Sequence, residues 1–68
     1  SIGYDVELLT ADGKKMEGNL ISADEKGFVV VVPQKQKVEG KKRPQIVDVE
    51  MSFGYDDVKW VKAVIDFK

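Results

Sequence analysis

The side chains that could do chemistry in this chain are carboxylates, amines and hydroxyls. Asp and Glu number 12 and Lys and Arg number 11, so the formal net charge is −1, and His and Cys are absent. Imidazole acid–base catalysis, thiol nucleophiles, disulfides and zinc-finger ligands are therefore excluded. Paired carboxylates serve glycoside hydrolysis only beside a substrate cleft that 68 residues are too few to form, and Ser22 and Ser52 have no imidazole to activate them. We predict no catalytic residues, no metal site and no cofactor, and hence a protein that is not an enzyme.

The charges are divided along the chain. Residues 35–44 carry five bases against Glu39 alone, a local balance of +4, whereas residues 48–57 carry four acids and no base. A basic segment of this kind suits the phosphates of RNA or an acidic protein surface. The alternative is a solvated loop whose charges favour solubility and protect an edge. The predicted partner-binding residues are Lys35, Lys37, Lys41, Lys42 and Arg43.

The acidic segment has two interpretations. Asp48, Glu50, Asp56 and Asp57 could meet a protein rich in Lys and Arg. We favour a structural role, in which the first two line the outer face of a strand and the last two cap a short turn.

Two aromatic residues are candidates for contact with a partner. Trp60 falls on the opposite phase from Val61, so it either covers one end of the fold or lies on the surface. Tyr55 is open to the same alternatives, and aromatic rings near such turns can line a peptide groove. Trp60 and Tyr55 are therefore included as contact aromatics.

Turn signals divide the chain into short strands at regular intervals. Asp12-Gly13 and the Gly27 that closes the next polar cluster mark two turns. A Gly in the middle of a strand, Gly18, predicts a bend or a close approach of backbones. The expected strands, from the alternation of apolar and polar residues, cover 4–10, 15–23, 28–32, 45–53 and 60–67.

The connections between these strands carry further expectations. Residues 28–32 are aromatic and β-branched throughout, which predicts a central strand buried on both faces. Pro33 cannot donate to a ladder, so it marks an edge or the end of regular pairing. Residues 35–44 are expected to form a long exposed loop or the tip of an extended hairpin, and residues 54–57 one turn of 3-10 helix.

These elements predict an all-β fold, a small five-stranded SH3-like or Sm-like barrel with a bent second strand and a short 3-10 turn before the last strand. The residues on the inward phases form the predicted core: Val6, Leu8, Met16, Leu20, Phe28, Val30, Val32, Val47, Val49, Met51, Ala63, Ile65 and Phe67.

The order of motifs resembles the C-terminal domain of the bacterial ribosome maturation factor RimP, in the form found in the Bacteroides-like branch. The weaker part of the resemblance runs through Val6-Glu7-Leu8 and the Gly18-x-Leu20-x-x-x-Asp24 pattern, which many small barrels share. Its more specific part is the basic stretch Lys37-Val38-Glu39-Gly40-Lys41-Lys42-Arg43, followed by Tyr55-Asp56-Asp57-Val58-Lys59.

The resemblance implies a non-catalytic module that promotes maturation of the small ribosomal subunit by docking on a ribosomal protein, on rRNA or on both. It also implies that residues 1–68 are one barrel domain, the C-terminal part of a two-domain protein whose N-terminal α/β domain is absent and would be a further partner. We expect a cytoplasmic monomer with no membrane contact, since the longest apolar run is far too short to span a bilayer. The alternatives are an Sm-like RNA-binding oligomer and an SH3-type peptide-binding module.

Overall fold

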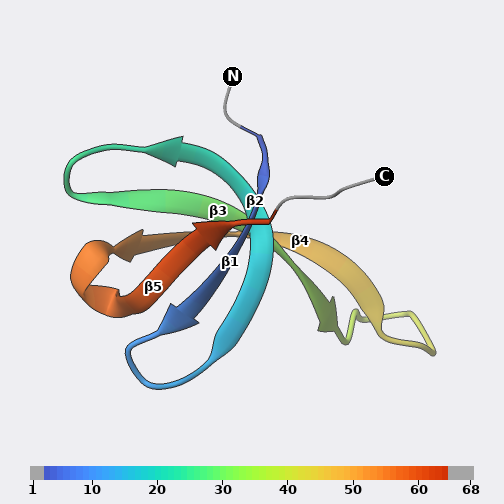
Figure 1. Cartoon of the computed structure of the whole chain (residues 1–68). Helices are drawn as coiled ribbons and strands as arrows, with labels where there is room; N and C mark the ends of the chain where they lie inside the picture. The colour runs from blue at the N-terminus through green and yellow to red at the C-terminus, as the bar shows by residue number, and fades with distance from the viewer. Residues whose placement is uncertain (1–2, 65–68) are drawn as a thin grey trace.

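The chain folds into a single curled antiparallel β-sheet, described over residues 3–64 by a computed structural model (Figure 1). The elements along the chain are β1 (Asp5–Thr10), β2 (Lys15–Ala23), β3 (Gly27–Gln36), β4 (Gln45–Gly54), the one-turn 3-10 helix η1 (Tyr55–Asp57) and β5 (Val58–Ala63). The strand order is β4-β3-β2-β1-β5, so β4 and β5 are the two edges. The predicted all-β fold with five strands and a short turn before the last one is confirmed. Over residues 3–64 the edges do not pair with each other, so the barrel curls without closing.

The second strand is shared between the two halves of the sheet. Its first half pairs with β1, its second half pairs with β3, and the register shifts between Leu20 and Ser22. Gly18 lies where the strand passes from one half to the other. A Cβ on Gly18 would lie 2.6 Å from the backbone oxygen of Val31, far inside van der Waals contact. The predicted bend and close backbone approach are therefore confirmed.

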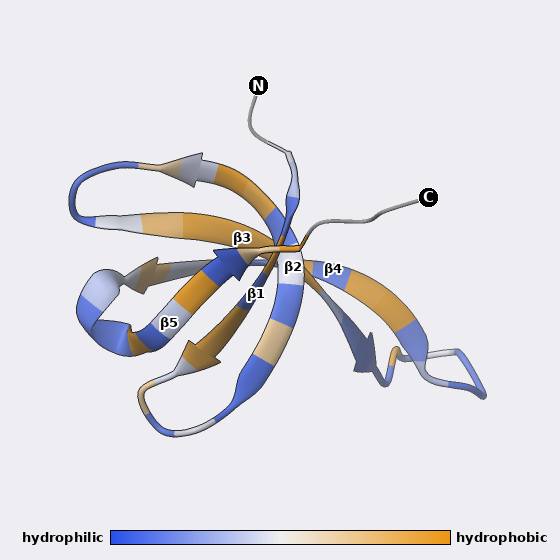
Figure 2. Ribbon diagram, viewed as in Figure 1, coloured by the Kyte–Doolittle hydropathy of each residue, from blue (hydrophilic) through white to orange (hydrophobic). Residues whose placement is uncertain are grey.

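The core lies on the inner face of the curled sheet, where the apolar bands of the strands meet (Figure 2). Leu8 and Val30 are fully buried at its centre. The other buried apolar residues are Val6, Leu20, Phe28 and Val32, and the half-buried residues packed against them are Met16, Met51, Phe53, Val58 and Val61. Val47 and Val49, on the same phase of β4, are half-buried as well.

Two predictions about burial are wrong. Residues 28–32 are buried on the inner face of the sheet but not on the outer face. Val29 and Val31 point to the outer face, where they are half-buried. The sheet is a single layer, so only its inner face is covered. Ala63, predicted in the core, is exposed at the end of β5 although it pairs opposite the buried Val6. The predicted core positions Ile65 and Phe67 lie outside the described residues.

The third strand is longer than predicted. It continues through Pro33 to Gln36 and pairs with β4 along its whole length, so 35–44 forms the end of an extended hairpin. Pairing with β2, in contrast, stops at Val31, opposite Asn19. A strand tolerates proline at a position where the backbone nitrogen, which carries no hydrogen, points away from the neighbouring strand. Pro33 therefore marks an edge, as predicted, but it does not end the strand.

The last strand begins earlier than the predicted range, at Val58 directly after η1, and ends at Ala63. Over residues 3–64, no helix has the length and apolar composition needed to cross a membrane.

Candidate binding surfaces

The β3–β4 hairpin extends away from the rest of the sheet and carries the predicted basic residues at its end (Figure 1). Lys35 lies in the last part of β3, opposite Ile46 of β4. The connecting loop turns where the N–H of Lys41 donates to the carbonyl oxygen of Val38 at 3.1 Å and Gly40 adopts φ 82°. The structure therefore brings together the five predicted residues, which we call the basic tip: Lys35, Lys37, Lys41, Lys42 and Arg43.

The side chains of the basic tip are all exposed. Over residues 3–64, the ion pairs join Glu7 to Lys15 and to Lys62, each at 3.6 Å, and none involves the tip. The tip is therefore a concentration of positive charge, offset in its own loop by Glu39 and joined by no ion pair to a carboxylate of the described chain. None of the five belongs to the core cluster of the described residues.

Tyr55 does not lie at the tip. Its hydroxyl donates to the carbonyl oxygen of Asp24 at 2.7 Å, and its ring centroid lies 5.8 Å from that of Phe28. These contacts tie η1 to the turn between β2 and β3, at the opposite end of β3 from the tip. Because β3 spans ten residues, about 30 Å separate the two ends. Tyr55 is still 46% exposed, so one edge of its ring reaches solvent.

Trp60 lies on β5, at the other edge of the sheet from the hairpin. It pairs opposite Leu9, and its exposed fraction is 37%. The Nζ atom of Lys62 lies 5.0 Å from the centroid of the indole, a cation–π contact. The structure thus does not join the contact aromatics to the basic tip. It distributes the predicted site residues over separate surfaces.

Tyr4 was not among the predicted site residues, but the structure places it at the same hollow as Tyr55. The two rings line a hollow of about 220 Å³ whose other walls include Phe28 and Val61. Tyr4 is 52% exposed. The sequence does not predict that Tyr4 and Tyr55 share a hollow, because that depends on how η1 packs against the sheet.

Asp48, Glu50 and Asp57 have the positions that we favoured, whereas no capping hydrogen bond involves Asp56 among the described residues. Asp48 and Glu50 are exposed on the outer face of β4. The Oδ2 atom of Asp57 accepts a hydrogen bond from the N–H of Gly54 at 2.9 Å, which caps the start of η1. The predicted capping role is therefore confirmed for Asp57.

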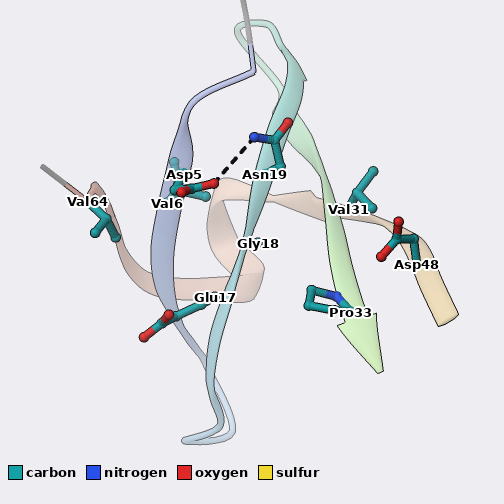
Figure 3. A pocket seen from close by; sticks show the side chains of 9 residues that line it. All are labelled: Asp5, Val6, Glu17, Gly18, Asn19, Val31, Pro33, Asp48 and Val64. Atoms are coloured by element: carbon teal, nitrogen blue, oxygen red, sulfur yellow. Dashed lines mark hydrogen bonds between the residues drawn. The ribbon is translucent and has the colours of Figure 1, made fainter. Parts of the chain in front are cut away.

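A second hollow, of about 340 Å³, was not predicted and lies where β2 and β3 diverge (Figure 3). Three carboxylates line it, from Asp5 of β1, Glu17 of β2 and Asp48 of β4. The alternation of each strand indicated that these side chains face outward. Their grouping could not be predicted, because it depends on which strands adjoin and on where the ladder between β2 and β3 stops.

The turn between β1 and β2 holds a carboxyl, that of Asp12, whose pKa is shifted. The hydroxyl of Thr10 donates to Asp12 and accepts from the N–H of Lys14 at 2.9 Å. The hydrogen bond from Thr10 lowers the pKa of Asp12 below its ordinary value, and the charge of Lys14 acts in the same direction. This network stabilises a turn and forms no site.

Neither a protein-family model nor a solved structure gives a significant match to this chain.

Proposed function

We propose that this chain is a non-catalytic module that promotes maturation of the small ribosomal subunit in the cytoplasm. Its basic tip docks on rRNA, on a ribosomal protein or on both. The observation that carries the proposal is the basic tip, with five exposed cations at the end of a protruding hairpin and no ion pair to the rest of the described chain. The resemblance of the sequence to the C-terminal domain of RimP supplies the ribosomal context.

The shape of the hairpin supports contact with a large and uneven partner. The loop from residue 37 to 44 extends beyond the ends of β3 and β4, so it can enter a depression that the body of the sheet cannot. Lys and Arg at such a position neutralise phosphates and release the ions condensed on the nucleic acid. The binding should therefore weaken steeply as salt is added.

The distribution of charge supports a fixed orientation of the bound module. The tip is strongly basic, whereas the net charge of the whole chain is −1. A polyanion therefore attracts one end of the molecule and repels much of the remainder. The contribution of the module is affinity and positioning rather than chemistry.

The test is retention of the chain on immature and mature small subunits in a pull-down. The variant is Lys41→Ala/Lys42→Ala/Arg43→Ala, and the matched control, Lys14→Ala/Lys26→Ala/Lys59→Ala, removes the same charge from exposed positions elsewhere. We expect the wild-type chain and the control to be retained on immature subunits and the tip variant to be lost. Equal retention of the two variants, or no retention of the wild-type chain, would contradict the proposal.

Two simple measurements address the alternatives. A large oligomer in light scattering would indicate an Sm-like ring. Binding to proline-rich peptides, with shifts at Tyr4 and Tyr55, would indicate an SH3-type module instead. We expect a monomer and no such binding.

A further inference from the structure

We infer that the hollow between β2 and β3 is a docking groove for an extended, Lys/Arg-rich segment of a protein partner. This surface is distinct from the basic tip. Within residues 3–64, three features carry the inference: an edge of β2 that no strand covers, apolar walls, and a rim of carboxylates without an ion-pair partner.

The groove lies at a fork in the sheet, which is the point where β2 and β3 separate. The ladder between β2 and β3 ends at the pair Asn19 and Val31, and continuing its register would place Glu17 opposite Pro33. Since proline has no N–H, the ladder cannot run on in regular form at that point. Before Asn19, β2 pairs with β1 alone, and beyond Val31, β3 pairs with β4 alone. Over residues 3–64, two strand edges therefore border the groove without a strand between them.

The edge of β2 from Lys15 to Gly18 keeps its backbone N–H groups, so an extended peptide can add to it by main-chain hydrogen bonds. Pro33 limits the β3 edge to side-chain contacts. The walls suit the side chains of such a peptide. Val31 and Pro33 form the β3 side, and Val64, which is 44% exposed, lies on the β1 side. Together they offer apolar surface to the aliphatic stems of Lys or Arg, whose charged heads then reach the rim.

The rim supplies the complementary charge. Asp5, Glu17 and Asp48 come from three strands and are spread around the hollow in Figure 3. The carboxylate of Asp5 accepts a long hydrogen bond, 3.4 Å, from the side-chain nitrogen of Asn19. The neighbouring lysines on this face, at positions 15 and 62, are both paired with Glu7 instead. Within the described chain the three rim carboxylates therefore have no cation within ion-pair distance.

Other ligands fit this groove less well. A phosphate-bearing ligand would meet three carboxylates and no base. Over residues 3–64, no three acidic side chains are grouped closely enough to hold a metal ion. An extended cationic chain satisfies separate carboxylates at separate points along its length, and that is the arrangement that the groove presents.

The inference is tested by fluorescence anisotropy with a labelled peptide of about twelve residues that alternates lysine and threonine, so that its lysines share one face when extended. The groove variant is Glu17→Gln/Asp48→Asn. The matched control is Glu25→Gln/Asp56→Asn, which changes the charge equally at exposed positions outside the groove. We expect the groove variant to bind about three- to tenfold more weakly than the wild-type chain, and the control to bind as the wild-type chain does. A peptide with glutamate in place of lysine should not bind.

Backbone amide shifts locate the bound peptide. We expect the largest shifts on both sides of the fork, at Glu17, Gly18, Val31 and Gln34. Equal weakening in both variants would show attraction to net negative charge and would overturn the inference, as would shifts gathered elsewhere or no binding at all. None of these results bears on the basic tip, because the groove variant leaves every tip residue in place.

Discussion

The two halves of β3 differ in almost every property, although they belong to one strand. The near half, residues 27–31, is paired on both sides by β2 and β4, and it supplies Phe28 and Val30 to the core. The far half, residues 32–36, is paired with β4 alone and becomes exposed and basic toward its end. The ladder changes from two-sided to one-sided beside Pro33.

The difference teaches how so short a chain can both fold and bind. A domain of this size buries only about 60% of the surface of its unfolded chain, so it can lose few apolar contacts without unfolding. The near half contributes to stability through apolar contacts. The far half adds Val32 to the core, and beyond Val32 it carries Lys35 and leads into the charged loop of the basic tip. Substitutions in the near half and in the basic tip should therefore separate stability from binding.

The largest expected effect is in the near half. Phe28 is 4% exposed, and its ring lies 5.7 Å from that of Phe53. Replacing Phe28 by Ala should lower the free energy of unfolding by about 3–5 kcal/mol, whereas Lys35→Ala in the far half should change it by less than about 0.5 kcal/mol. Urea denaturation measures both.

Because Phe28→Ala can unfold a domain of this size outright, Phe28→Leu provides a milder variant in the same assay. It should remain folded and still be clearly less stable than Lys35→Ala. If Lys35→Ala and Phe28→Leu were equally destabilising, the contrast between the two halves would be wrong.

The next effect concerns the point where β2 passes between the halves of the sheet. Gly18→Ala places a Cβ 2.6 Å from the backbone oxygen of Val31, so the strands must separate. We expect a loss of about 1–3 kcal/mol in the free energy of unfolding. Ser22→Ala, at an exposed position of the same strand, is the control and should cost less than about 0.5 kcal/mol. A neutral Gly18→Ala would show that the close approach is not required.

A smaller effect is expected where Tyr55 of η1 contacts the residues at the start of β3. Tyr55→Phe removes the hydrogen bond from the hydroxyl to the carbonyl oxygen of Asp24 and leaves the ring beside Phe28. The free energy of unfolding should fall by about 0.5–1.5 kcal/mol. Tyr4→Phe serves as the comparison and should be near neutral in the same denaturation series. Equal values for the two would mean that the hydroxyl of Tyr55 does not fasten the turn.

The smallest effect depends on pH and lies outside β3. The hydrogen bond from Thr10 holds the pKa of Asp12 below its ordinary value of 3.8 in the folded chain. The ionised carboxylate therefore stabilises the fold above pH 3.8, and this contribution is lost as the pH falls through the lowered pKa. Asp12→Asn should lower the melting temperature slightly at neutral pH, and the difference from the wild-type chain should vanish in acid. A difference that persists below the lowered pKa would assign the effect to something other than the charge.

The sequence predicts the elements of this fold better than their burial. Alternation and turn signals locate all five strands, and the range predicted for the second strand, 15–23, matches β2 at both ends. Gly18 and the short turn at Tyr55–Asp57 follow from backbone chemistry and were also predictable. Ala63 and Val31 were misjudged because burial depends on which face of the sheet is covered, and alternation alone does not show that.

The candidate sites also differ in how far the sequence predicts them. The basic tip was visible as a run of charge, because its residues are neighbours in the sequence. The groove rimmed by Asp5, Glu17 and Asp48 was not visible, because three strands contribute one carboxylate each. Tyr55 was identified as an aromatic near a turn, but its bond to Asp24 depends on the packing of η1.

The central claim, that the basic tip binds and does not stabilise the fold, is tested most directly by salt-dependent binding to immature small subunits. The chain and its Lys41→Ala/Lys42→Ala/Arg43→Ala variant are titrated at several salt concentrations, and their melting temperatures are compared. If the tip contacts rRNA phosphates, the variant should bind more weakly, and its slope of log affinity against log salt should be smaller by about 2–3, with an unchanged melting temperature. An unchanged affinity and slope, or a loss of binding that accompanies a lowered melting temperature, would contradict the account.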